Sequence, residues 1–305
     1  MTVQAKTKTA AKSESLYLTL LGSATCYYDA AGIRTRAIEA GTGFPLIMLH
    51  GVGGTAEAYA RNVVPLGEHF HVYALDALGH GLTGTVPGNH DYKAYVKHII
   101  DFMDAAGIEK AHMAGESLGG WISVWTAILH PDRVANVMYI VGAKLGPPNV
   151  PEEAMIKTRA GQAELVRLSK QMRDNPSWEN TRERMKWLFY NVDRDLVDEL
   201  VDLRWKLYER GLSEDSPEGA RTAGPSSTAQ QQDDKLTPEV LARLKNRTLV
   251  LWTDHNPSQV LAVAEAAMPY FPNAELKVMK DCGHWPQWED VETFNQIAID
   301  FLTKS

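Results

Sequence analysis

The sequence has few cysteines, no basic block and no long apolar run. Its two cysteines, Cys26 and Cys282, lie far apart without metal-ligand spacing, which favours a reducing compartment over a disulfide scaffold or a zinc site. The 31 Lys and Arg residues are outnumbered by 38 Asp and Glu residues, so the concentrated positive surface that nucleic acid requires is not expected. No apolar run approaches the roughly 18 residues of a membrane span, and the N-terminus lacks the apolar core of a secretion signal. These absences predict a cytoplasmic protein without nucleic-acid or membrane partners.

Short apolar runs alternate with helical patterns along much of the 305-residue chain. Residues 44–50, 70–76, 110–115 and 134–141 have the composition of buried strands, and 92–106 has helical spacing. The alternation stops near Gly146 and resumes with strands at 248–252 and 275–279 and helices from about 258 and about 289 to 302. This order predicts an α/β fold with a mostly parallel central sheet flanked by helices.

The interruption of the alternation divides the chain into a core and an insertion. Residues 1–14 are expected to form a disordered arm, because they are rich in Lys, Thr, Ala and Ser. Residues 15–145 and 236–305 are assigned to the core. Residues 146–235 are more charged and largely helical, and they end in a polar loop composition. They are predicted to form a helical lid inserted before the last strands.

The sharpest chemical motif is Gly115-Glu116-Ser117-Leu118-Gly119, which lies between a predicted strand and an apolar helix. It has the G-x-S-x-G pattern of a nucleophile elbow, in which a tight turn exposes the serine hydroxyl. A strand-to-helix turn with an incidental serine would look similar in sequence. The strand before the motif and the helix after it favour a catalytic Ser117.

A serine nucleophile requires a general base and an oxyanion site. Of the ten histidines, His284 alone lies far downstream of the serine, after a strand end and beside a glycine. The backbone N–H groups of Leu118 and Val52 are the expected oxyanion donors. His50, at the start of the same glycine-rich turn as Val52, is expected to be structural.

These motifs, in this order, resemble those of the α/β-hydrolase superfamily. The ending Cys282-Gly-His-Trp-Pro-Gln-Trp-Glu289 is similar to that of the meta-cleavage product hydrolases, which cleave C–C bonds in aromatic degradation. In the lid, the segment 196–205 is similar to the helix that supplies their carboxylate-binding arginine, here Arg204. From its helical position alone, Arg204 flanks the buried face and either snorkels, pairs with a lid carboxylate or faces the pocket. The resemblance favours the pocket.

The resemblance implies a small-molecule substrate and a specific reaction. A vinylogous diketone with a carboxylate at its enol end would bind between core and lid, held by Arg204 and contacted by Trp285, Gly51 and Gly53. After ketonisation, Ser117 would attack the ketone, and water would release the acid. No cofactor and no metal are required, and a homodimer is implied. The side chains that select the ketone substituent are expected in the lid, among Met155, Trp187, Phe189 and Tyr190.

Three positions depart from the family pattern. Glu116 precedes the serine, where a small or amide residue is common, and Ala58 stands where an asparagine is usual. The triad acid normally follows the strand ending at Trp252 by about four residues, which is the place of Asn256. We favour Asp254 as the third triad member, because asparagine cannot stabilise an imidazolium, with Asn256 as the alternative.

Other functions remain open at this stage. A carboxylesterase or amide hydrolase of a small acidic substrate would use the same serine, base and oxyanion site. A hydrolase-fold receptor would use the pocket for recognition with little turnover. A cofactor-free oxygenase on the same fold would consume oxygen.

Overall fold

The computed structural model describes residues 15–86, 90–212 and 234–304, so the predicted N-terminal arm and most of the polar loop that ends the lid lie outside the described residues. Eight strands form one sheet in the order β1-β2-β4-β3-β5-β6-β7-β8. Strands β1 and β2 pair antiparallel, as do β2 and β4, and the remaining neighbours are parallel. The bounds of the strands are β1 Ala24–Ala30, β2 Ile33–Ala40, β3 Pro45–Leu49, β4 His71–Leu75, β5 Ala111–Glu116, β6 Val134–Ile140, β7 Arg247–Thr253 and β8 Ala274–Met279.

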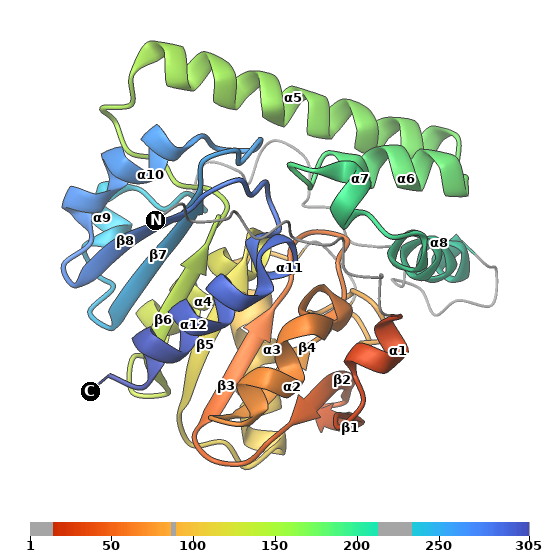
Figure 1. Cartoon of the computed structure of the whole chain (residues 1–305). Coiled ribbons are helices and arrows are strands. Elements are labelled where there is room, and N and C mark those ends of the chain that lie inside the picture. The colour runs from red at the N-terminus through yellow and green to blue at the C-terminus, as the bar shows by residue number, and fades with distance from the viewer. Residues whose placement is uncertain (1–14, 87–89, 213–233, 305) are drawn as a thin grey trace, which may run out of the picture.

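The predicted mostly parallel sheet is confirmed, and helices cover both of its faces. In Figure 1, α2 and α12 lie in front of the sheet, and α3 and α4 lie behind it. The core helices span α1 Leu16–Thr19, α2 Ala60–Gly67, α3 Tyr92–Ala105, α4 Leu118–Leu129, α9 Pro238–Leu241, α10 Leu261–Ala267, α11 Pro286–Glu289 and α12 Val291–Leu302, with 3-10 turns η1 Ala56–Tyr59 and η2 Met268–Tyr270. Among the described helices, none is both long and apolar enough to cross a membrane.

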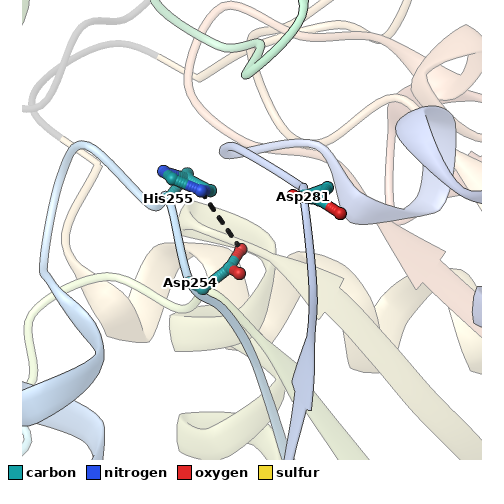
Figure 2. Close-up of side chains that lie close together, drawn as sticks. All are labelled: Asp254, His255 and Asp281. Carbon is teal, nitrogen blue, oxygen red and sulfur yellow. Dashed lines mark ion pairs between the residues drawn. The ribbon is translucent and has the colours of Figure 1, made fainter.

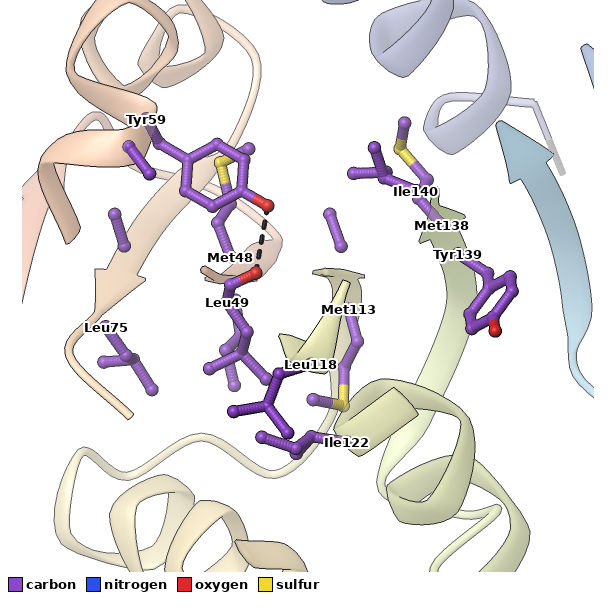
Figure 3. Packing of buried hydrophobic residues seen from close by; sticks show 14 of the residues in the cluster. Met48, Leu49, Tyr59, Leu75, Met113, Leu118, Ile122, Met138, Tyr139 and Ile140 are labelled. Carbon is purple, nitrogen blue, oxygen red and sulfur yellow. Dashed lines mark hydrogen bonds between the residues drawn. The ribbon is translucent and has the colours of Figure 1, made fainter. Parts of the chain in front are cut away.

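The core lies where the apolar strands meet α4. All of β5 is buried, as expected for a parallel strand with both faces covered. Figure 3 shows Leu118 and Ile122 of α4 close to Met113 of β5. The Tyr59 hydroxyl, also buried, donates a hydrogen bond to the Leu49 carbonyl at 3.0 Å. This packing fixes the carboxyl ends of β3 and β5, from which two of the predicted catalytic segments emerge.

In the described part of the segment between β6 and α9, four helices are present, and they lie across the top of the sheet in Figure 1. They are α5 Glu152–Asp174, α6 Trp178–Lys186, α7 Val192–Asp195 and α8 Asp198–Leu212. The backbone at Leu196 is extended and separates α7 from α8, which carries Arg204. Asn191 caps α7 by accepting a hydrogen bond from the Arg194 N–H.

Candidate active site

Ser117 occupies a strained turn between β5 and α4. Its backbone has φ 53° and ψ −111°, which non-glycine residues rarely adopt and which is typical of functional sites. The turn is so tight that a Cβ on Gly115 would lie 2.1 Å from the Gly119 backbone, and one on Gly119 would lie 2.0 Å from the Leu49 carbonyl oxygen. The two glycines of the motif are therefore sterically required, and the strand-turn-helix context expected of a nucleophile elbow is present.

His284 is held by the loop between β8 and α11. The backbone N–H of His284 donates to the Leu188 carbonyl, which follows α6, at 2.6 Å. The backbone N–H of the neighbouring Gly283 donates to the Glu289 carboxylate at 2.8 Å. The Trp187 ring packs edge-on against the imidazole at 5.3 Å between centroids. Sequence reasoning gave no role to Glu289, although it belongs to the ending that carried the resemblance. Burial raises the pKa of Glu289 to about 7.

The Nδ1 atom of His284 contacts Asn256. The distance to Asn256 Oδ1 is 2.8 Å, and Asn256 is 3% exposed. The amide is oriented because its Nδ2 donates to the Gln259 carbonyl at 2.9 Å, which leaves Oδ1 as the atom facing His284. An amide oxygen only accepts hydrogen bonds, so Nδ1 carries the proton.

Asp254 does not reach His284, and the preference for it as the partner of His284 is corrected by this geometry. Figure 2 shows its carboxylate beside His255 and Asp281 on the loops that follow β7 and β8. Its nearest charged partners are His255 Nε2 at 3.9 Å and Lys280 Nζ at 4.0 Å. The Asp254 N–H still bonds to the Met279 carbonyl, as a continuation of β7 would, and only the later turn brings Asn256 to the imidazole. The ligand atoms of Asp254, His255 and Asp281 lie within 4.8 Å of one another, but His255 and Asp281 are exposed, as is common for solvated acidic clusters.

Glu116 lies on the other side of the His284 ring. Its Oε1 is 3.0 Å from Nε2, and the residue is 1% exposed. No partner among the described residues contacts its Oε2, and a Cβ on Gly51 would lie 2.6 Å from that atom, so Gly51 provides the space for the carboxylate. Because Nδ1 already holds a proton toward Asn256, an attractive contact between Nε2 and a carboxyl oxygen requires one more proton. Glu116 thus places a buried carboxyl oxygen within hydrogen-bond reach of the second nitrogen of His284.

The same contact keeps the predicted base, His284, turned away from the predicted nucleophile, Ser117, in this arrangement. Within the described chain, no hydrogen bond joins the Ser117 hydroxyl to His284, whose Nε2 faces Glu116. In enzymes without bound substrate, catalytic hydrogen bonds are often long or absent and form only with substrate. Sequence reasoning noted Glu116 only as a departure from the family pattern. Its position directly before the serine, at the end of a buried strand, was the available signal.

The predicted oxyanion donors come from two converging turns. Leu118 is the first residue of α4, where a backbone N–H has no partner within its own helix. Val52 follows β3 in a turn closed by the Gly54 N–H and the Gly51 carbonyl at 3.0 Å, with Gly53 at φ +68°. His50 supports this turn by contacting the Gly51 carbonyl through Nδ1, while its Nε2 accepts the Ala77 N–H. Burial lowers the pKa of His50 to about 4, so the ring is neutral and structural.

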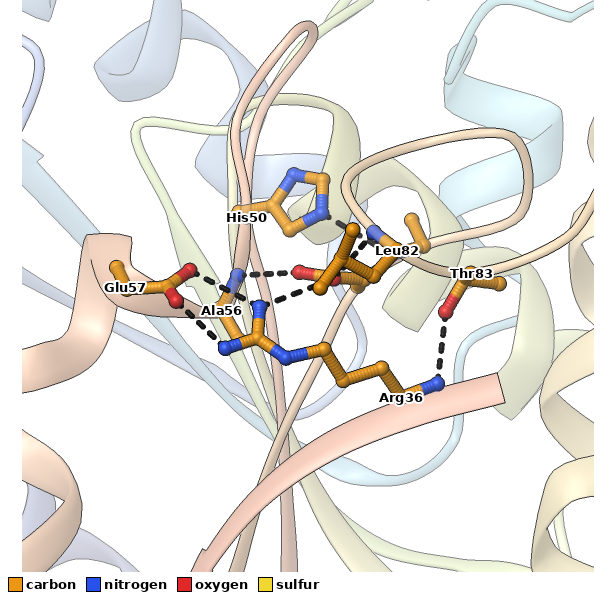
Figure 4. Close-up of polar contacts among 8 residues, drawn as sticks. Arg36, His50, Ala56, Glu57, Leu82 and Thr83 are labelled. Atoms are coloured by element: carbon orange, nitrogen blue, oxygen red, sulfur yellow. Dashed lines mark hydrogen bonds and ion pairs between the residues drawn. The ribbon is translucent and has the colours of Figure 1, made fainter. Parts of the chain in front are cut away.

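A buried ion network holds the floor of the site. The Arg36 guanidinium lies 2.6 Å from the Glu57 carboxylate and 3.2 Å from the Asp76 carboxylate. Figure 4 shows Arg36 facing Glu57. Asp76 also accepts the backbone N–H groups of Ala56 and Leu82. These bonds attach the turn after β4 to the segment after Val52. Arg36 and Glu57 belong to no recognisable sequence motif, so the sequence did not predict this network.

Arg204 of α8 lines a cavity of about 120 Å³ between the inserted helices α5–α8 and the core. The cavity also borders Val52 and Gly53 of the predicted oxyanion turn. The guanidinium carbon lies 5.9 Å from the Trp285 ring centre, and no carboxylate of the described residues lies within 4.0 Å of the side chain. Burial lowers the pKa of Arg204 to about 10, and the negative charge of Glu116 opposes this shift. Arg204 is thus a cation that faces the cavity and has no ion-pair partner among the described residues. Ala58, which stands where the family usually has an asparagine, is buried.

Three comparisons place the chain among known proteins. The family profile described as the alpha/beta hydrolase fold matches residues 45–291. The 2-hydroxymuconate semialdehyde hydrolase of Pseudomonas sp. (strain CF600) is 31% identical over 283 residues, which cover 90% of this chain and 93% of the relative. The 2-hydroxy-6-oxo-6-phenylhexa-2,4-dienoate hydrolase of Comamonas testosteroni is 28% identical over 277 residues, covering 87% and 89%. The solved structure of a meta-cleavage product hydrolase from Pseudomonas fluorescens superposes with a TM-score of 0.73 at 27% identity, covering 92% of this chain and 98% of that chain.

Proposed function

Because the chain belongs to the α/β-hydrolase family and is a hydrolase related to meta-cleavage product hydrolases, we propose that it hydrolyses a C–C bond in a 2-hydroxy-6-oxo-dienoate. The observation that carries the proposal is the position of Arg204, an arginine without an ion-pair partner on a cavity that reaches the oxyanion turn at Val52. A guanidinium binds a carboxylate in a bidentate manner, which fixes both position and orientation. The enol-end carboxylate of such a substrate is assigned to Arg204, and its ketone is assigned to the Val52 and Leu118 amides.

The first step is ketonisation of the bound dienolate. We propose that a proton held between Glu116 Oε1 and His284 Nε2 passes to the substrate carbon next to the ketone, and the enolate oxygen becomes a second ketone. This step discharges the pair, so that Nε2 of His284 regains a lone pair facing the site. The carbon that must leave is now activated by the new ketone.

The second step uses Ser117. Its hydroxyl proton passes to Nε2 of His284 while Oγ attacks the ketone, and the oxyanion is stabilised by the Val52 and Leu118 amides. The C–C bond then breaks, its electron pair goes to the 2-hydroxydienoate fragment, which takes the proton from His284 Nε2, and an acyl-serine remains. Water hydrolyses the acyl-serine: His284 Nε2 takes a proton from the water, returns it to Ser117 Oγ as the acyl bond breaks, and the acid is released, its own proton restoring the one held between Glu116 and His284.

Glu116 supplies the charge that Asn256 lacks. When Nε2 takes the serine proton, an imidazolium forms, and an asparagine on Nδ1 fixes the ring without stabilising its charge. The Glu116 carboxylate, 3.0 Å from Nε2 and almost completely buried, is placed to stabilise that cation. In this account Ser117, His284, Glu116 and Asn256 act together, and Asp254 takes no part.

The proposal is tested with a panel of ring-fission dienolates, whose visible absorbance is lost on cleavage. Decay of that absorbance with wild-type enzyme, absent in Ser117→Ala, supports the proposal. Hydrolysis of p-nitrophenyl esters without decay of any dienolate would replace it with the esterase alternative, and oxygen consumption would indicate the oxygenase. We also propose that the protein is a cytoplasmic homodimer. Light scattering after size-exclusion chromatography measures its molar mass and so tests the oligomeric state.

A further inference from the structure

We infer that Arg184 forms a second anion subsite, so that the substrate is a dicarboxylate with its second carboxylate on the ketone side. This inference rests on the proposed function, which already assigns the enol-end carboxylate to Arg204. Arg184 belongs to α6 and lines the same cavity as Arg204. The residue is 7% exposed.

The Arg184 guanidinium has unused donors. Its Nε donates to the Ser169 hydroxyl at 3.1 Å, whereas Nη1 is buried without a partner among the described residues. No carboxylate in the described part of the chain lies within 4.0 Å of this side chain. A buried guanidinium that is neither paired nor fully hydrogen-bonded is costly, and buried charges in proteins are normally paired. The missing partner is therefore an anion that enters the cavity.

The charge around the cavity supports an anion with two negative groups. Three arginines from three lid helices line it, namely Arg173, Arg184 and Arg204, and no acidic residue is among the lining residues. Burial lowers the pKa of Arg184 to about 9, and the charge of Arg204 adds to the shift, so the two guanidiniums repel each other. One carboxylate bound to Arg204 would leave Arg184 uncompensated.

The remaining charged groups near the site do not fill this role. Glu116 acts electrostatically on both arginines, but its Oε1 is engaged by His284. His50 and His80 contribute no charge at neutral pH, because burial lowers their pKa values to about 4 and about 3. The Arg184 guanidinium lies 5.5 Å from the Trp187 ring, which in turn contacts His284 edge-on. Arg184 is thus connected to the catalytic histidine through one aromatic ring.

The test uses binding, so that it does not depend on turnover. In a Ser117→Ala background, dissociation constants are measured by calorimetry for two ligands. The diacid is a 2-hydroxy-6-oxo-dienoate whose ketone side carries a propanoate chain, and the half-ester is the same compound with only that propanoate methylated. The parent is expected to bind the diacid about 10- to 100-fold more tightly than the half-ester. Arg184→Met should remove most of this preference while leaving half-ester binding within about threefold, and Arg184→Lys should retain part of it.

Two matched variants serve as controls. Arg204→Met should weaken binding of the diacid and the half-ester by the same factor, and Arg167→Met, at an exposed position of α5 that does not line the cavity, should change neither strongly. Equal affinity of the parent for diacid and half-ester, or equal losses for both on Arg184→Met, would overturn the inference. Failure of the proposed C–C hydrolysis gives a different result. The protein would still bind the diacid more tightly than the half-ester, but the wild-type enzyme would leave the absorbance of the diacid unchanged.

Discussion

The Glu116 carboxylate lies 3.0 Å from His284 Nε2, on the side of the imidazole opposite to its contact with Asn256. Hydrolase triads place the carboxylate at Nδ1, where it orients the ring and stabilises the imidazolium. In the proposed mechanism Asn256 keeps the orienting role, and Glu116, adjacent to Ser117 in sequence, takes the electrostatic one. This division would allow a triad to function with an amide as its third member.

Glu116→Gln should therefore reduce kcat by at least about 10²-fold, because it removes both the shared proton and the charge that stabilises the imidazolium. The measurement is the pH profile of kcat for the wild type, the single variant and Glu116→Gln/Asn256→Asp. The double variant should recover part of the activity, since it restores a carboxylate at Nδ1. Asp254→Ala serves as the control and should change kcat by less than about twofold. Near-wild-type activity of Glu116→Gln would refute its role.

Ser117→Ala should lower kcat by about 10³-fold or more while preserving the fold. Alanine and serine tolerate the strained backbone of this turn about equally, so the free energy of unfolding should change little. Denaturant unfolding and single-turnover kinetics measure the two effects. The serine mechanism fails if a preparation free of contaminating hydrolase keeps normal turnover.

Arg204→Ala should weaken capture of carboxylate substrates much more than that of neutral ones. A lost charge-assisted hydrogen bond is worth roughly 1.5 to 3 kcal/mol, which corresponds to about 10- to 150-fold in kcat/KM. The comparison is between a dienoate acid and its methyl ester at the enol end. An equal effect on both would show that Arg204 serves only the structure of the lid.

Acid should destabilise the protein through its buried histidines, and His112 offers a test. Burial lowers the pKa of His112 to about 4, whereas an unfolded histidine takes up a proton near pH 6.5. The unfolded state therefore binds more protons between these values, and the free energy of unfolding falls as the pH drops through that window. His112 packs on Phe44 at 4.7 Å and has an unpartnered Nδ1, so phenylalanine is a suitable replacement.

His112→Phe should flatten the pH dependence of unfolding by up to about 1.4 kcal/mol per pH unit between pH 6.5 and 4. Above pH 7 the variant and the wild type should show the same pH dependence. Denaturant melts at half-unit pH intervals measure the effect. Parallel curves for the two proteins down to pH 4 would contradict the assignment of His112 as an acid-sensitive group.

The sequence predicted the central strands because parallel strands with both faces covered are continuous apolar runs. Strands β1 and β2 were missed because β1 is an edge strand that alternates exposed and partly buried residues, which periodicity distinguishes poorly from a loop. The elbow was recognisable because steric constraints fix its glycines. The choice between Asp254 and Asn256 could not be made from the sequence, since it depends on where the chain turns after β7. Nor did sequence distinguish Arg184 from other lid arginines, because only burial and missing partners set it apart.

The most direct test of C–C hydrolysis is the source of the oxygen in the released acid. Wild-type enzyme is mixed with a ring-fission dienolate in H₂¹⁸O under air, and the acid from the ketone side is analysed by mass spectrometry after a single turnover. Hydrolysis through an acyl-serine should place one ¹⁸O atom and no atom from O₂ in the new carboxylate, together with loss of the dienolate absorbance. Retention of the dienolate, or an oxygen atom derived from O₂, would contradict hydrolysis by Ser117 and His284.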